Sequence, residues 1–192
     1  YFGCTGSDAV EAAFKLGRAL TRKPRTVSLV GAYHGCTMGS VSLMEPGPFA
    51  DQFAPHVPGA ARIPMQVAAL EADLAEGDVA AVFVEPIQVE GGVHALPDDF
   101  VDALCRLTGP DGPLLVADEI QTGLGRTGRG FLASSGWPRP PDVALLGKTL
   151  GGGLVPISAM LTSKAIFLKA YGRNFAAGES HNTTFAFNGV TA

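Results

Sequence analysis

The sequence predicts an α/β fold with a mostly parallel sheet and helices packed on its faces. Two observations support this prediction. Fully apolar runs at 79–84 and 114–117 have the length of buried strands, and segments with helical spacing of apolar residues lie between such runs. The composition agrees, since 46% hydrophobic and 17% charged residues are typical of a folded chain that buries a sheet.

The first part of the chain supplies a strand, a helix and a second strand. Residues 1–4 are expected to end a strand, and apolar residues that recur every three or four positions predict a helix over 8–21. Ser7 is the predicted N-cap of this helix. Residues 26–30 predict the next strand. The segment 39–65 is rich in glycine and proline without clear periodicity, so we expect a long loop there.

The second part continues the alternation. We expect a helix over 65–76, a strand over 79–84, a helix over 97–107 and further strands over 114–117 and 143–146. Strands that alternate with helices in this way form parallel sheets with the helices on the faces. No internal repeat or low-complexity linker interrupts the pattern, so one globular domain is expected.

Ionisable residues follow two of these strands directly. Asp118 and Glu119 come after the run 114–117, and Gly147 and Lys148 come after 143–146. In open α/β sheets, ligands bind outside the carboxyl ends of the strands. A carboxylate and an amine at that edge indicate either a structural ion pair or a cofactor site. The three glycines at 151–153 favour a cofactor site, because such a run indicates a sharp turn or a close approach of the backbone to another group.

Charge and cysteine content exclude several classes of protein. A formal charge of −4 and a pI near 5.5 argue against a nucleic-acid surface and against a polybasic membrane patch. No apolar run approaches 18 residues, so no membrane span is predicted. Three widely spaced cysteines fit neither a disulfide framework nor a metal cluster, which makes the cytoplasm the expected location. No metal site is predicted, because the histidines lack the spacing of zinc ligands.

Other catalytic motifs match poorly. Gly147, Lys148 and Thr149 repeat the tail of a phosphate-binding G-x-x-x-x-G-K-[ST] loop, but Asp142 stands where its first glycine belongs. The stretch 123–128 imitates a dinucleotide-binding G-x-G-x-x-G, yet no helical pattern follows it. No G-x-S-x-G occurs, which argues against a serine hydrolase of the α/β type.

Six segments together resemble the class III pyridoxal-phosphate aminotransferases, the ornithine and ω-amino acid group of fold type I. They are TGSDAVEAAFKLGRA, GAYHG, VEPIQVEGG, ADEIQTGLGRTG, DVALLGKTLGGGLVPISAM and HNTTFAFN. Their order is the family's order, and they span essentially the whole chain. The resemblance implies a mostly parallel, seven-stranded type of sheet with helices on both faces. It also implies that residues 1–192 form an incomplete cofactor-binding large domain, with an N-terminal segment and a C-terminal small domain outside this chain.

The resemblance assigns the reacting groups. Lys148 matches the lysine that forms the internal aldimine with the cofactor and later moves the proton between substrate and cofactor. Asp118 matches the carboxylate that keeps the pyridine nitrogen protonated, so that the ring can accept electron density. Gln121 matches a hydrogen-bond partner of the cofactor's 3′-oxygen. Lys148 and Asp118 are therefore the expected catalytic residues.

The remaining cofactor contacts are also implied by the resemblance. Gly6 and Ser7 match donors to the phosphate at a helix start, and Tyr33 matches the aromatic residue that stacks on the ring. Thr184 matches a residue that reaches the phosphate of the neighbouring subunit, which implies a homodimer with shared active sites. Glu85 matches an acidic residue that lines the cofactor pocket.

The expected substrate pocket contains two residues of the VEPIQVEGG segment. Glu90 matches an acidic residue that pairs with an arginine of the small domain in many family members. Val89 replaces the usual glycine and would influence substrate choice. Two further departures are Asp8 in place of a common glutamate, and 187–189 in place of a more usual G-N-P.

Taken together, the resemblance predicts a transaminase. The amino group of an ω-amino acid or diamine would pass through the lysine Schiff base of pyridoxal 5′-phosphate to a 2-oxo acid. An aminomutase or racemase of the same family would use the same residues, and a non-catalytic cofactor-binding remnant is an alternative from another class. The presence of Lys148, Asp118 and Gln121 argues against a remnant.

Overall fold

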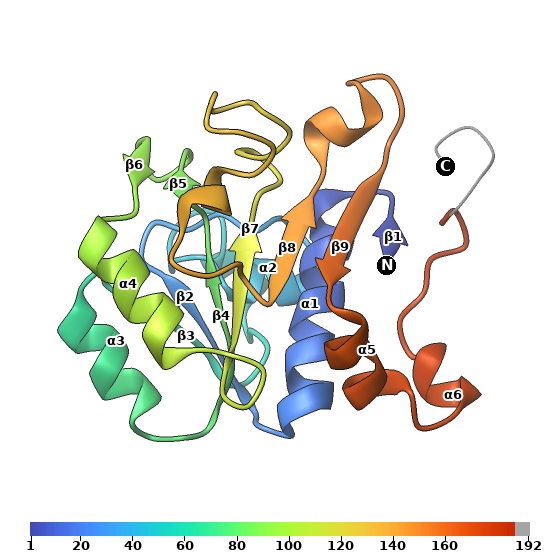
Figure 1. The fold of residues 1–192 in the computed structure, drawn as a ribbon, viewed down its shortest axis with the longest axis horizontal. Coiled ribbons are helices and arrows are strands. Elements are labelled where there is room, and N and C mark those ends of the chain that lie inside the picture. The colour runs from blue at the N-terminus through green and yellow to red at the C-terminus, as the bar shows by residue number, and fades with distance from the viewer. Residues whose placement is uncertain (187–192) are drawn as a thin grey trace.

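A computed structural model describes residues 1–186 and confirms the mostly parallel sheet. The seven strands run in the order β1-β9-β8-β7-β4-β2-β3 (Figure 1). They are β1 (Phe2–Gly3), β2 (Arg25–Leu29), β3 (Ala60–Ile63), β4 (Val79–Val84), β7 (Leu114–Asp118), β8 (Val143–Leu146) and β9 (Ser158–Thr162). Strands β3, β2, β4, β7 and β8 are parallel neighbours, whereas β9 pairs antiparallel with both β8 and β1. A separate small hairpin consists of β5 (Ile87–Gln88) and β6 (His94–Ala95).

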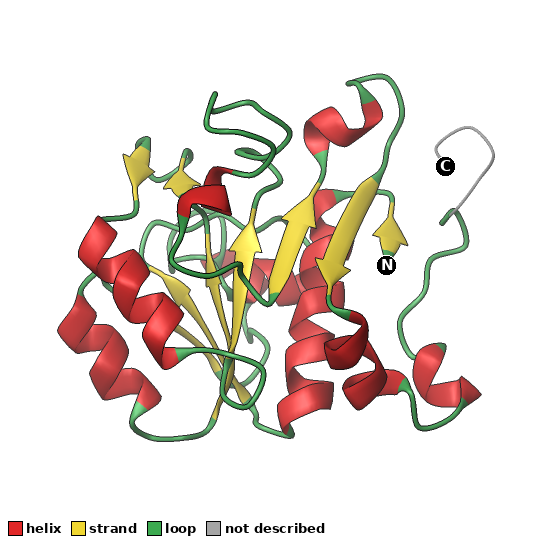
Figure 2. Ribbon diagram, in the orientation of Figure 1, coloured by secondary structure: helices red, strands yellow, loops and turns green. Residues whose placement is uncertain are grey.

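Helices cover both faces of the sheet, as Figure 2 shows. The α-helices are α1 (Gly6–Thr21), α2 (Met38–Ser42), α3 (Val67–Leu74), α4 (Asp98–Leu107), α5 (Lys164–Tyr171) and α6 (Phe175–Gly178). The short 3₁₀ helices are η1 (Asp51–Phe53), η2 (Ala133–Gly136) and η3 (Lys148–Gly151). One buried cluster joins α1 and α5 to the sheet, and another joins α3 and α4 to it. The two clusters are the two faces of one core.

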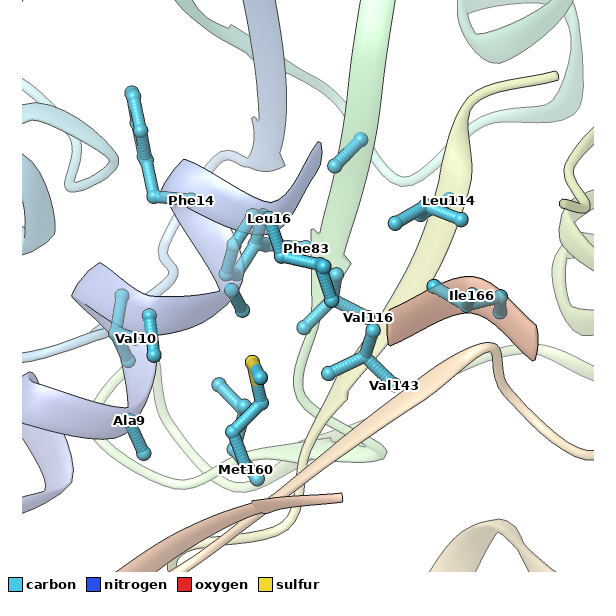
Figure 3. Close-up of a cluster of buried hydrophobic side chains, with 14 of the residues drawn as sticks. Ala9, Val10, Phe14, Leu16, Phe83, Leu114, Val116, Val143, Met160 and Ile166 are labelled. Carbon is cyan, nitrogen blue, oxygen red and sulfur yellow. The ribbon is translucent and has the colours of Figure 1, made fainter. Parts of the chain in front are cut away.

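Strand β4 shows how the sequence builds this double-sided core. All six of its side chains are buried. Because side chains alternate across a strand, Ala81 and Phe83 contact the α1 cluster, whereas Val82 and Val84 contact the α3–α4 cluster. Figure 3 shows Phe83 among the apolar side chains of the α1 cluster. The continuous apolar run, rather than an alternating one, follows from burial on both faces.

The start of α1 differs from the sequence prediction, because Thr5 rather than Ser7 is the N-cap. The helix begins at Gly6, where the Thr5 hydroxyl accepts a hydrogen bond from the Asp8 amide at 3.2 Å. The Asp8 carboxylate in turn accepts from the amide of Thr5. Such a reciprocal pair, a threonine at the N-cap and an acid three residues later, is a capping box that satisfies two backbone amides at the helix start. Ser7 lies in the first turn, and its hydroxyl is free to contact another segment.

The sequence predicted a long loop over 39–65, and this prediction was wrong. It contains most of α2, all of η1 and strand β3. Helix α2 spans only five residues, too few to show helical periodicity, and β3 is a short strand at the edge of the sheet with three half-buried residues. Among residues 1–186, no helix combines the length and apolar character needed to cross a membrane.

Candidate functional site

A pocket lies beyond the carboxyl ends of β4, β7 and β8, at the edge where the sequence predicts a site. Its lining includes both reacting groups expected from the sequence, Lys148 and Asp118. The other lining residues come from the start of α1 and from the segments that follow β2, β4 and β7. They are Gly6, Tyr33, His34, Gly35, Glu85, Ile120 and Gln121. Folding therefore brings together six of the residues predicted for cofactor binding: Gly6, Tyr33, Glu85, Asp118, Gln121 and Lys148.

Lys148 follows β8 after one glycine and has an unusual backbone conformation. Its φ angle is 44°, in the left-handed region that residues other than glycine rarely adopt. A residue held in such a region costs on the order of 1–3 kcal/mol and is found most often at functional sites. The side chain is exposed to the pocket side of the sheet edge. The strained conformation is thus retained at the one amine that lines the pocket.

Asp118 ends β7 and is almost completely buried, with 4% of its surface exposed. One carboxylate oxygen lies 2.8 Å from Nδ1 of His34, and the other accepts a hydrogen bond from the amide of Ile120 at 3.2 Å. His34 packs edge-on against Phe83 and is buried. Burial alone would lower the pKa of His34, but the hydrogen bond to Asp118 and the charges of Asp118 and Glu85 raise that pKa above its ordinary value.

His34 is the site residue that sequence reasoning missed. Its partner Asp118 lies 84 positions away in the chain, so no local motif reveals the pair. The only local signal is its place directly after Tyr33 at the end of a predicted strand. The arrangement holds one carboxylate oxygen of Asp118 and fixes the direction of its side chain.

Glu85 follows the last residue of β4 directly. Its carboxylate accepts a hydrogen bond from the amide of Tyr33 at 3.0 Å. Burial raises the pKa of Glu85 to about 7; the nearby charge of His34 opposes that rise, and the charge of Asp118 adds to it. Glu85 therefore changes its protonation state near neutral pH while it holds the backbone of the segment after β2.

Tyr33 borders the open side of the pocket, with 36% of its surface exposed. Its hydroxyl lies 3.1 Å from the sulfur of Cys36. This hydrogen bond and partial burial raise the pKa of Tyr33 to about 12, so the phenol stays protonated at neutral pH. A partly exposed aromatic ring in the lining of a pocket can offer a face to a flat ligand.

Glycines allow three backbone segments to meet around the pocket. A Cβ atom at Gly6 would lie 3.0 Å from the Ile120 side chain, and one at Gly147 would lie 3.3 Å from it. Gly35 has φ near 115°, and a Cβ there would collide with the Ser7 hydroxyl. Ser7 itself accepts a hydrogen bond from the Cys36 amide at 3.1 Å. The missing side chains at these glycines therefore let the start of α1 and the segments after β2, β7 and β8 pack closely around the pocket.

This arrangement fits pyridoxal phosphate by the chemistry of its donors. The first amides of a helix lack partners within the helix, and together with the positive end of the helix dipole they favour a phosphate. At the start of α1 these amides belong to Gly6 and Ser7. The pocket also supplies a primary amine at Lys148, a buried carboxylate at Asp118 and an aromatic face at Tyr33. Each of these groups has a natural counterpart on the cofactor.

The other predicted residues do not line this pocket. Ser7 stands beside it through its contact with Cys36. Val89 and Glu90 follow β5 in the small hairpin, where Glu90 is exposed but close enough for its charge to help raise the pKa of Tyr33. Thr184 is exposed and lies after α6, in the segment that approaches α1 through the contact of Lys15 with Ser180.

A larger cavity nearby shows that volume alone does not identify the site. It encloses about 500 Å³, compared with about 50 Å³ for the pocket that contains Lys148. The β5–β6 hairpin, α4 and the segment 127–138 line it. Its lining contains Asp98, Asp102 and Arg129 but no lysine. The smaller pocket is the candidate site because it contains the amine and the buried carboxylate together.

Comparisons with known proteins agree with this geometry. The family model described as "Aminotransferase class-III" matches residues 1–192. A curated relative from Pyrococcus furiosus, described as a putative [LysW]-aminoadipate semialdehyde/glutamate semialdehyde transaminase, is 39% identical over 175 residues. That match covers 91% of this chain and 47% of the relative. The chain therefore spans about half the length of this relative.

Solved structures share the fold. The ornithine aminotransferase of Toxoplasma gondii matches with a TM-score of 0.82 and 36% identity over 88% of this chain and 42% of that one. An amine transaminase from an uncultivated Pseudomonas species, solved in its PLP-bound internal aldimine form, matches with a TM-score of 0.85 and 28% identity. That match covers 96% of this chain and 48% of the other. The fold is that of these aminotransferases.

Proposed function

The chain belongs to the class III aminotransferases, and from this premise we propose that it forms the cofactor-binding part of a pyridoxal-phosphate-dependent transaminase. The observation that carries the proposal is the meeting of Lys148 and Asp118 in one pocket, although 30 positions separate them in the sequence. An amine and a buried carboxylate at one sheet edge, beside an aromatic ring and a helix start, form the set of groups that this cofactor requires.

Different residues at the pocket would bind different parts of the cofactor. Gly6 and Ser7 would hold the phosphate at the start of α1, and Tyr33 would cover one face of the ring. Gln121 would donate a hydrogen bond to the ring oxygen. When bound, pyridoxal phosphate supplies an aldehyde that reacts with amines and a ring that withdraws electrons. The chain's own residues provide orientation and proton transfer.

Asp118 and Lys148 perform the two chemical tasks of the protein. The Asp118 carboxylate, fixed by His34 and by the Ile120 amide, would hold a proton on the ring nitrogen through a charge-assisted hydrogen bond. Lys148 would bind the aldehyde carbon and, once displaced by the amino donor, move a proton between the substrate carbon and the cofactor. Burial of Asp118 strengthens its interaction because little water screens the charge.

The proposed substrates are an ω-amino acid or a diamine as donor and a 2-oxo acid as acceptor. The names of the relatives support this class, since one concerns semialdehyde substrates, one ornithine and one amines. Val89 and Glu90 would contribute to the substrate side of the pocket. We also propose a homodimer in the cytoplasm, in which Thr184 reaches the phosphate of the partner's site.

A donor panel tests the proposed activity. The holoenzyme is incubated with ornithine, putrescine and a β-amino acid, each with 2-oxoglutarate, and glutamate formation is followed. We expect turnover with at least one ω-amine, and a loss of at least about 10,000-fold in the Lys148→Ala variant, the upper range for a positioned acid–base group. Lys164→Ala, an exposed lysine at the start of α5, serves as the matched control and should retain activity.

Two outcomes would contradict the proposal. Activity that survives in Lys148→Ala at more than about one hundredth of the wild-type rate would remove the lysine from the mechanism. Rearranged or racemised amino acid without glutamate formation would instead indicate an aminomutase or racemase.

A further inference from the structure

Glu119 is a deeply buried carboxyl group that does not line the candidate site. It follows Asp118 directly and has only 1% of its surface exposed. The two neighbouring acids have different partners: Asp118 contacts His34 on the α1 side, whereas Glu119 contacts the loop that follows β7. Successive residues at the end of a strand face opposite sides, which separates the two carboxylates. The proposed chemistry therefore does not explain why Glu119 is buried beside Asp118.

The side chain of Glu119 receives three hydrogen bonds from this loop. One oxygen accepts from the Thr122 hydroxyl at 2.6 Å and from the Ala133 amide at 3.1 Å. The other oxygen accepts from the Ser134 amide at 2.7 Å. All three donors are neutral, and all belong to the segment that leaves and returns to the end of β7. Buried carboxylates need such donors, because burial without them is very unfavourable.

The main chain of Glu119 makes two more connections. Its amide donates to the carbonyl of Leu145 on β8 at 3.0 Å, and its carbonyl accepts from the Gly123 amide at 2.8 Å. Leu145 lies three residues before Lys148. Gly123 closes the tight turn that carries Gln121, and a Cβ there would lie 2.8 Å from the Glu119 carbonyl. Glu119 thus joins the strand that leads to the lysine, the turn with Gln121 and the far end of the loop.

The Glu119 carboxylate joins the two ends of the loop at its base. A second contact, from the Leu124 amide to the Phe131 carbonyl, closes the inner part of the loop at 2.6 Å. Figure 1 shows the loop extending beyond the upper end of β7 before it returns to η2. Loops whose ends are held together in this way keep a compact shape and often carry functional residues. Loss of the Glu119 contacts would release the return segment at Ala133 and Ser134.

We propose that Glu119 is a positioning residue of the cofactor site. Its buried carboxylate closes the loop after β7 and so fixes the turn that presents Gln121 beside Asp118. The inference rests on the proposed binding of pyridoxal phosphate in the pocket. Glu119 itself touches neither cofactor nor substrate and acts through the backbone of residues 120–123.

Three variants of the holoenzyme test this inference. Glu119→Gln keeps the shape of the side chain but turns an amide NH₂ group toward backbone donors. Thr122→Val removes one of the three donors and is the milder change. Asp142→Asn is the matched control, because Asp142 is also a largely buried carboxylate that accepts an amide hydrogen bond, from Leu115 at 2.8 Å, at the opposite end of the sheet.

The measurements are the dissociation constant of pyridoxal phosphate and the visible circular dichroism of the bound cofactor, which depends on how the ring is held. We expect affinity to fall about tenfold in Glu119→Gln and about threefold in Thr122→Val, with altered dichroism in both. The affinity of Asp142→Asn for pyridoxal phosphate should stay within about twofold of the wild-type value, and its dichroism should not change. We expect this even where the thermal stability of Asp142→Asn falls as much as that of Glu119→Gln.

Unchanged affinity and dichroism in Glu119→Gln would overturn the inference. Equal weakening in Asp142→Asn would also overturn it, because the effect would then follow from stability alone. Where Glu119→Gln does not fold, Thr122→Val decides, and wild-type values there would contradict the positioning role. Wild-type protein that binds no pyridoxal phosphate would overturn the proposed function as well, which distinguishes the two failures.

Discussion

Carboxylates at the two ends of the parallel strands have different partners. At the amino ends, acids are paired with arginines: Asp142 with Arg139, and the group Asp73, Glu76 and Asp78 with Arg25. At the carboxyl ends, Glu85, Asp118 and Glu119 are buried, and the described residues that line the Lys148 pocket include no arginine. Their partners are His34, hydroxyl groups and backbone amides.

This difference separates structural charge from functional charge. A carboxylate that is matched by an arginine is satisfied within the protein and leaves little to offer a ligand. Burial raises the pKa of Glu85, and the charge of Asp118 adds to that rise. Burial opposes the rise in the pKa of His34, but the hydrogen bond to Asp118 and the charges of Asp118 and Glu85 outweigh it. Such perturbed groups in a pocket are characteristic of functional sites. The candidate site thus lies where the buried acids have partners other than arginine among the described residues.

Asp118→Asn should produce the largest contrast between the two ends. Loss of the charge that holds the ring proton is expected to lower kcat/KM about 1,000-fold, equivalent to about 4 kcal/mol of transition-state stabilisation. The free energy of unfolding should fall as well, because the buried His34 loses its charged partner, although an amide retains the contact with the Ile120 amide. Steady-state kinetics and urea unfolding of the same variant measure both quantities. Activity within tenfold of the wild type would contradict the assigned role.

Asp142→Asn should lower stability without lowering activity. Removal of one partner of a largely buried ion pair typically destabilises a protein by about 3–5 kcal/mol. Because Arg139 is partly exposed, we expect about 3 kcal/mol of lost unfolding free energy, measured in urea, with kcat unchanged. A large loss of kcat at preserved cofactor affinity would mean that the amino ends also contribute to the chemistry.

The buried groups at the carboxyl ends of the strands, Glu85 above all, should make the stability of the protein depend on pH. Because the folded-state pKa of Glu85 is raised from 4.5 to about 7, the protonated form contributes stability below pH 4.5, and this contribution is lost as pH rises through 7. His34, whose pKa is also raised, loses its contribution in the same direction above its ordinary value of 6.5. Unfolding of the cofactor-free protein in urea should therefore become easier between pH 5 and 8 by as much as about 3 kcal/mol.

Glu85→Gln provides the control for this pH effect. The variant has no carboxyl group to titrate, and the missing negative charge also lowers the pKa of His34, so its stability should vary less over the same pH range. Identical pH profiles for the two proteins would show that Glu85 is not buried as described.

Arg25→Met should have the smallest effect. Arg25 contacts three acids at the amino edge of the sheet, but two of these acids are substantially exposed to solvent. The pairs with Glu76 and Asp78 contribute little and are screened by salt, so the less exposed pair with Asp73 accounts for most of the expected loss. We expect a loss of about 2 kcal/mol in unfolding free energy, of which only the smaller part shrinks in high salt. Urea unfolding at low and high ionic strength measures this loss, and cofactor affinity should not change.

The sequence was sufficient for the buried strands because their pattern is local. Strands β4 and β8 begin and end where their apolar runs do, since burial on both faces leaves no polar position inside them. Helix α2 and strand β3 were missed because neither is long enough to establish a period. Strand β9 was missed because its partners are set by tertiary pairing with β8 and β1.

The same distinction holds for the site. Lys148 and Asp118 could be predicted because each lies at the carboxyl end of an apolar strand, Asp118 as the last residue of β7 and Lys148 one glycine after β8. The rule for strand ends places them at one edge of the sheet. His34 could not be assigned a role, because its contact with Asp118 arises only when β2 and β7 take their places in the sheet. Thr184 and Glu90 remain predictions that involve groups outside the described pocket.

The central claim is that Lys148 is the residue that binds the cofactor covalently. Reduction of the holoenzyme with borohydride, followed by peptide mass spectrometry, tests this claim most directly. We predict a single pyridoxyl modification, on the peptide that contains Lys148. A modification at another lysine, or none after saturation with pyridoxal phosphate, would contradict the account.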